Sequence, residues 1–116
     1  MNNSLSIEEI FNLVRDTLNR AGSSSHQSEA VADTISRAER DGSVSHGLFR
    51  LPGYFASLKS GKVNPDPNPK LSHTTKAVLK CDGDRSYAPL VHKKYLNNLV
   101  DVSKEIGVGI LSINRV

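Results

Sequence analysis

The 116-residue chain is long enough for one domain or for part of a larger one, and its 37% hydrophobic content is somewhat low for a self-contained core. Aromatic residues make up 5% and tryptophan is absent, so either the core is aliphatic or some apolar faces await another segment or subunit. The net charge of +3 is spread along the chain, and Lys93 and Lys94 are the only adjacent basic residues, which argues against nucleic acid as a partner.

Cysteine usage and apolar runs indicate the compartment. The single cysteine, Cys81, allows no internal disulfide, which is typical of a reducing environment. The N-terminus lacks the basic and apolar regions of a secretion signal, and the longest apolar runs are too short to span a membrane. We therefore expect a cytoplasmic protein with no membrane partner.

Two helices are predicted at the start of the chain. Ser6 and Glu9 have the spacing of a capping box, and apolar residues follow at helical spacing. A second helix is expected from residue 25 to about residue 41, with Ser24 and Gln27 as a second capping box. Each helix carries one apolar face.

A third helical segment follows Gly42, and Pro52 interrupts it. Proline in a helix interior removes a hydrogen bond and crowds the preceding turn. The pattern therefore favours a short turn from Ser45 to Leu51, followed by a helix with Pro52 at its first position that ends before Gly61.

The remaining residues predict strands around one more helix. Alternating prolines make residues 63–70 an extended connection, after which residues 71–81 form one or two strands with a turn near Lys76. A helical stripe runs to Ile106 and is closed by Gly107, and residues 108–113 have the composition of a buried strand. We expect an α/β fold divided into a helical segment (1–62), the connection (63–70) and the start of an α/β domain (71–116).

The candidate site is the pair His46 and Arg50. If helix begins at Ser45, residues four apart share a face, so both side chains project the same way and one pocket could hold them. Imidazole exchanges a proton near neutral pH, and the planar guanidinium fork fits a carboxylate. Ser45 is a candidate N-cap for that helix. Spacing alone leaves a second interpretation open, because such pairs also occur as solvated or capping arrangements.

Other polar motifs favour structural roles. The remaining histidines, at positions 26, 73 and 92, have no carboxylate or thiol partners at ligand spacing, so no metal site is predicted. Gly107 and Gly109 precede a strand rather than linking a strand to a helix, so the nucleotide-binding fingerprint is missing. Asp82-Gly83-Asp84 after a strand is typical of a turn.

The residues around the candidate site resemble those of a known family. The motif Asp41-Gly42-x-x-Ser45-His46-Gly47-x-x-Arg50-Leu51-Pro52-x-Tyr54, followed by Leu58-x-x-Gly61-x-x-x-Pro65, closely resembles the malate/L-lactate dehydrogenase family, which is unrelated to Rossmann-type dehydrogenases. The similarity extends from about Ile7 to Asn114. Cys81-Asp82-Gly83-Asp84 matches the family's Val-Asp-Gly-Asp turn, and Lys104-Glu105-x-Gly107-Val108 matches its Ala-Lys-Glu-x-Gly-Val.

The resemblance implies a reaction and roles for three residues. Family members interconvert small 2-oxo acids or cyclic imino acids with the corresponding 2-hydroxy acids or cyclic amino acids, using NADH or NADPH. By resemblance, His46 is the proton donor, Arg50 holds the substrate carboxylate and Ser45 assists orientation. The cofactor-binding residues are left unassigned, and the resemblance implies a homodimer for the whole protein.

The chain departs from the family pattern in two ways. Arg85-Ser86-Tyr87-Ala88-Pro89 stands where the family commonly has a Gly-x-Gly-Gln-like segment, which leaves the substrate open. The family also continues beyond Val116 with Asn-His-x-Gly and its cofactor-binding region. We therefore expect an incomplete fragment of a larger non-Rossmann dehydrogenase fold that is inactive alone, with NAD or NADP preference undecided.

Two other functions are considered. In the first, the second and third helices form a helix-turn-helix that binds nucleic acid, although Pro52 and Gly53 inside the supposed recognition helix argue against it. In the second, the chain keeps the family fold as a non-catalytic interaction protein.

Overall fold

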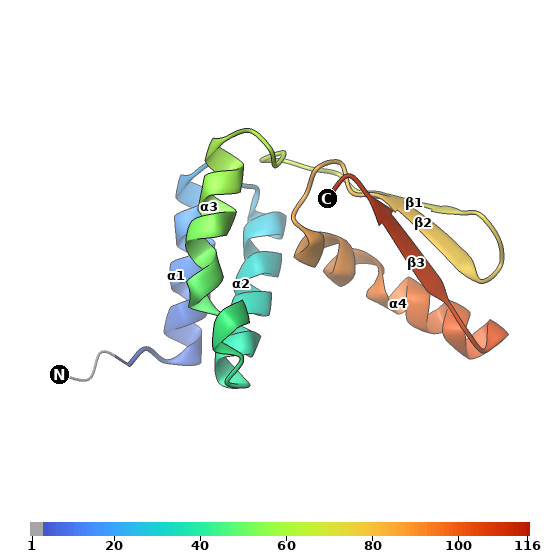
Figure 1. Ribbon diagram of the computed structural model, residues 1–116, viewed down its shortest axis with the longest axis horizontal. Coiled ribbons are helices and arrows are strands. Elements are labelled where there is room, and N and C mark those ends of the chain that lie inside the picture. Colours follow the sequence, from blue (N-terminus) through green and yellow to red (C-terminus); the bar gives the residue numbers. More distant parts are fainter. Residues whose placement is uncertain (1–3) are drawn as a thin grey trace.

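The computed structural model describes residues 4–116, which form three helices beside a small sheet and a long helix (Figure 1). The helical part contains α1 (Ile7–Arg20), α2 (Ser25–Arg40) and α3 (Leu51–Lys59), with the 3-10 turns η1 (Val44–His46) and η2 (Leu48–Arg50) before α3. The second part contains β1 (Lys70–His73), β2 (Val78–Asp82), α4 (Ala88–Ile106) and β3 (Ile110–Asn114). The molecule measures 54 × 30 × 20 Å, and the first three residues of the expected helical segment lie outside the described part.

Local capping explains where the first helices begin. The Ser6 hydroxyl accepts from the Glu9 backbone N–H at 3.0 Å, and the Glu9 carboxylate accepts from the Ser6 N–H at 3.1 Å, so the predicted capping box is confirmed. The second box forms only in part. The Ser24 hydroxyl accepts from the Gln27 N–H at 3.4 Å, but the Gln27 side chain binds buried partners instead of the cap.

The core lies between α1 and α2, with contributions from α3 and the start of α4. Its buried members are Ile10, Val14, Leu18, Val31, Ala32, Ile35, Leu58 and Tyr87. The apolar stripes predicted for the first two helices therefore face one another.

The segment between α2 and α3 differs from a continuous helix that begins at Ser45. Gly47 separates η1 from η2, and the candidate cap hydroxyl of Ser45 is not used, because the N-cap of η1 is Ser43. The alternative of a short turn and a new helix is correct in outline. Pro52 is tolerated because it lies in the first turn of α3, where backbone N–H groups have no helical acceptor.

The sheet has the order β1-β2-β3, with β1 antiparallel to β2 and β2 parallel to β3. The helix α4 makes the crossover between the parallel strands and ends at Gly107, whose φ of +95° is the left-handed cap predicted there. The α/β fold class is therefore confirmed.

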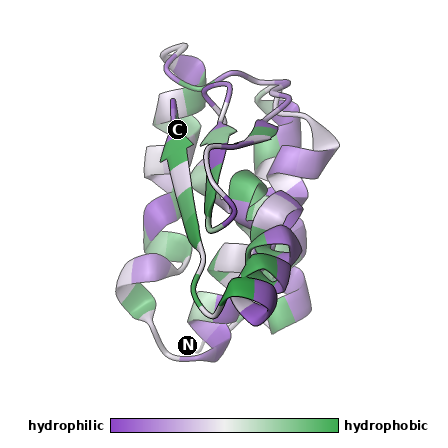
Figure 2. Cartoon of the chain, turned by 90° about the vertical axis from the view of Figure 1, so that its right-hand side faces the viewer, coloured by the Kyte–Doolittle hydropathy of each residue, from purple (hydrophilic) through white to green (hydrophobic). Residues whose placement is uncertain are grey.

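The prediction that residues 108–113 form a buried strand is wrong about burial. The strand alternates between exposed and half-buried residues, with Ile110 54% exposed and Leu111 half-buried, and among the described strands it pairs with β2 alone (Figure 2). Figure 2 shows hydrophobic residues along this strand, which ends at the C label.

Two loops are bonded to each other and position the start of α4, one between α3 and β1 and the other between β2 and α4. The turn expected at Asp82-Gly83-Asp84 is centred on Asp84 and Arg85, whose φ angles of 53° and 57° are left-handed. The Asp84 carboxylate accepts from the Asn68 N–H at 2.9 Å, and the Arg85 carbonyl accepts from the Asn64 N–H at 2.8 Å. These bonds connect the loop before α4 to the loop after α3.

Candidate functional site

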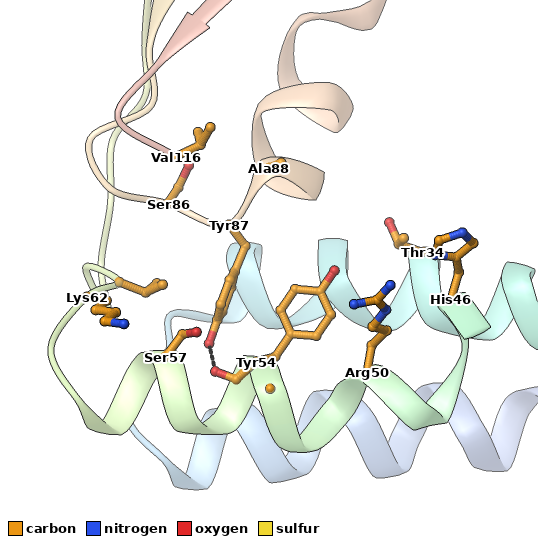
Figure 3. Close-up of a pocket in the computed structure, with 12 residues that line it drawn as sticks. Thr34, His46, Arg50, Tyr54, Ser57, Lys62, Ser86, Tyr87, Ala88 and Val116 are labelled. Atoms are coloured by element: carbon orange, nitrogen blue, oxygen red, sulfur yellow. Dashed lines mark hydrogen bonds between the residues drawn. The ribbon is translucent and has the colours of Figure 1, made fainter. Parts of the chain in front are cut away.

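A cavity of about 690 Å³ lies between α3 and the loop that leads into α4 (Figure 3). Both residues of the predicted pair, His46 and Arg50, line it. The other polar residues of the lining are Thr34, Tyr54, Ser57, Lys62, Ser86 and Tyr87. The structure therefore brings the motif from the α2–α3 connection together with residues near position 87.

Gly47 allows the turn to pack closely on α2. A Cβ atom at this position would lie 2.0 Å from Oε1 of Glu39, so any other residue would displace the Glu39 side chain. The same Oε1 accepts the Leu48 N–H at 2.8 Å, which holds η2 against α2. Glu39 therefore fixes the turn that carries both His46 and Arg50.

The backbone of the turn orients Arg50. Its Nε–H donates to the Ser45 carbonyl at 2.8 Å, and no bond within residues 4–116 engages its two terminal nitrogens. Those nitrogens are the part of guanidinium that binds a carboxylate in a two-pronged way. Ser45 is exposed and does not line the cavity, so in this structure it contributes through its carbonyl rather than its hydroxyl.

Two tyrosines form the middle of the cavity wall. The Tyr87 hydroxyl donates to the Tyr54 carbonyl, and the two rings meet edge to face with centroids 4.8 Å apart. Burial raises the pKa of Tyr87 to about 12, with a further contribution from Tyr54. Burial also raises the pKa of Tyr54, and the nearby charge of Arg50 opposes that rise.

Gln27 holds Tyr87 from the interior of the protein. Its side chain is fully buried, its Oε1 accepts the Tyr87 N–H at 2.8 Å, and its Nε2 donates to the Asn64 carbonyl at 3.0 Å. One amide thus connects α2 to both loops that border the cavity.

Sequence reasoning misses these three residues for different reasons. Tyr54 lies four residues after Arg50 within the motif, and that spacing is a usable signal, although the apolar pattern assigns Tyr54 to packing. Gln27 has the position of a capping residue. Tyr87 gives no signal beyond its place in the segment that departs from the family pattern.

Neither a metal cluster nor a membrane-spanning helix is present in the described part of the chain. Among residues 4–116, no group of three or more histidine, cysteine, aspartate or glutamate side chains is placed to hold a metal ion. Within the same residues, no helix is both long and apolar enough to cross a membrane.

Comparison with known proteins decides the family. The sequence profile of the malate/L-lactate dehydrogenase family matches residues 5–116. The chain belongs to this family. It is 43% identical over 110 residues to the Δ1-pyrroline-2-carboxylate reductase of Ancylobacter novellus, covering 95% of this chain and 32% of that protein. It is also 32% identical over 100 residues to the L-sulfolactate dehydrogenase of Methanocaldococcus jannaschii, covering 86% of this chain and 29% of that protein.

Solved structures of the family have the same fold. The Δ1-piperideine-2-carboxylate reductase of Pseudomonas syringae superimposes with a TM-score of 0.90 at 31% identity, covering 97% of this chain and 34% of that one. The chain therefore spans about a third of the length of the malate/L-lactate dehydrogenase family members that it matches. These relatives are reductases and dehydrogenases, so the family is one of oxidoreductases.

Proposed function

We propose that this chain provides the acid-binding and proton-donating part of an NAD(P)-dependent oxidoreductase that acts on a small 2-oxo acid or cyclic imino acid. The observation that carries the proposal is that His46 and Arg50 line one cavity although a glycine separates their turns. The named activities of the relatives support the same substrate class, because each concerns a small carboxylate with a reducible or oxidisable carbon beside it.

The proposed mechanism divides the work between two side chains. The terminal nitrogens of Arg50 bind the substrate carboxylate and fix which face of the adjacent carbon is exposed. Hydride addition to that carbon breaks the π bond and leaves an electron pair on the carbonyl oxygen or imine nitrogen. His46 then gives its proton to that atom, and an O–H or N–H bond forms. In the reverse direction, His46 takes the proton back.

The hydride is supplied by a nicotinamide cofactor when one is bound. Within residues 4–116, Gly107 and Gly109 lie between α4 and β3 rather than at the start of a helix, so they do not form the glycine-rich phosphate loop of Rossmann-type enzymes. We propose that the cofactor is held chiefly by the part of the family fold that this chain does not span. The homodimer stays a prediction, and the preference between NADH and NADPH stays undecided.

Binding of a stable substrate mimic tests the assignment of Arg50. Pyrrole-2-carboxylate is a flat acid of the size of a cyclic imino acid, and we expect it to shift the NMR resonances of residues around Arg50. Arg50→Ala should weaken binding roughly 10- to 100-fold, because a hydrogen bond to a charged group contributes about 1.5–3 kcal/mol. Arg37→Ala is the matched control, since Arg37 is exposed and pairs with Asp33 away from the cavity. Equal affinities of wild type and Arg50→Ala would contradict the proposal.

A further inference from the structure

The cavity has two polar ends. His46, Arg50 and Thr34 lie on one side of the rings of Tyr54 and Tyr87, and Ser57, Lys62 and Ser86 lie on the other (Figure 3). We refer to these as the Arg50 end and the Lys62 end. Tyr87 is only 6% exposed although it lines the cavity, so most of its surface is packed against protein.

The ring of Tyr87 is held at several points. Its hydroxyl bonds to the Tyr54 carbonyl, and its ring edge meets the Tyr54 ring at 84°. Its backbone N–H donates to Gln27, which is fully buried and bonded in turn to the Asn64 carbonyl. Swinging the ring aside would break the hydroxyl's bond to the Tyr54 carbonyl and the edge-to-face contact between the rings, which is costly. The ring therefore acts as a fixed wall.

The position of this wall matters for an acid bound at Arg50. In Figure 3 the ring of Tyr54 lies between the guanidinium of Arg50 and the ring of Tyr87. A long or fused-ring acid that extends from the guanidinium toward the Lys62 end would therefore meet the Tyr54 ring, which Tyr87 supports through its edge-to-face contact and its hydroxyl bond. A compact acid would fit in front of that ring. The wall comes from residues 85–89, which is the segment where the sequence departs from the family pattern.

We propose that Tyr87 is a specificity-determining residue: by holding the Tyr54 ring in place, it keeps the two ends of the cavity apart and restricts the Arg50 end to compact acids, pyruvate-sized or with a single ring. The inference rests on the proposed function, since it presumes that Arg50 binds the carboxylate. Beyond that function, the inference states the size of acid that can bind and names the residue that excludes larger acids.

Two matched acids test the size limit on the 116-residue chain. Pyrrole-2-carboxylate and indole-2-carboxylate share the acid and the ring nitrogen, and the second adds one fused ring. By NMR titration, wild type should prefer the pyrrole acid at least ~10-fold, the scale on which a packed apolar pocket discriminates by size. Tyr87→Ala should abolish or reverse that preference. Tyr87→Leu is a milder variant that keeps an apolar contact in the core, and it should shift the preference in the same direction.

Two controls isolate the ring of Tyr87. Tyr87→Phe keeps the ring and should keep the preference. Tyr95→Leu removes a tyrosine within α4, whose hydroxyl bonds to the Pro69 carbonyl outside the cavity, and it should also leave the preference unchanged. An unchanged preference in folded Tyr87→Leu would overturn the inference while leaving the proposed function intact. If neither acid bound to any of these proteins, both the inference and the proposed function would be overturned.

Discussion

At the scale of single residues, the site depends on a glycine and a carboxylate as much as on the side chains assigned to chemistry. His46 and Arg50 sit on separate turns, and their common direction comes from the packing of Gly47 against Glu39. Without a Cβ at position 47, the Glu39 carboxylate can reach the Leu48 N–H. The regular spacing of a helix is therefore not what aligns the pair.

Gly47→Ala should destabilise the protein by about 1.5–3 kcal/mol, the range for losing a hydrogen bond to a charged group. The added Cβ would displace Oε1 of Glu39 and with it the bond to Leu48. Urea unfolding measures the change. Gly53→Ala is the control, because a Cβ at Gly53 would meet no atom within 4 Å and alanine favours helix. Equal stabilities of the two variants would refute this account of Gly47.

At the scale of elements, sequence periodicity predicts most of the fold. The hairpin of β1 and β2, the helix α4 with its Gly107 cap and the box at Ser6 all follow from short-range rules. The exposure of β3 does not, because exposure is set by which neighbours a strand has and not by its own composition. The role of Gln27 also follows no local rule, since its partners at positions 64 and 87 are distant in sequence.

The contact between α3 and the start of α4 should depend on pH. The pKa of Tyr87 is raised to about 12 in the folded protein, so folding favours the protonated phenol. This stabilisation is complete below the pKa of an unfolded tyrosine, about 10, and is lost as the pH rises through about 12. The free energy of unfolding should therefore fall by about 2–3 kcal/mol across that window.

Urea unfolding between about pH 9 and about pH 12 measures that decline. Tyr87→Phe lacks the ionisable group, so its free energy of unfolding should decline less over the same pH range. Some decline should remain, because burial also raises the pKa of Tyr54. An identical pH profile for the variant and the wild type would contradict the role given to Tyr87.

At the scale of the whole molecule, the motif and the structure agree on a family whose matched members are about three times as long as this chain. The resemblance seen in residues 41–65 is confirmed by the family match over residues 5–116 and by the superposition on a solved reductase. The residue pair of the site can be predicted from sequence because it lies within one motif. The places of Gln27 and Tyr87 beside it cannot, because these residues reach the cavity only through the fold.

The most direct measurement is the activity of a chimera in which residues 5–116 replace the matching third of the Ancylobacter novellus reductase. We expect the chimera to reduce Δ1-pyrroline-2-carboxylate with NADH or NADPH, and the unmodified reductase calibrates the assay. His46→Ala in the chimera should lower kcat roughly 10²- to 10⁴-fold, the usual contribution of a positioned proton donor, with little change in the binding of pyrrole-2-carboxylate. Turnover by His46→Ala at the rate of the unmodified chimera would contradict the central claim.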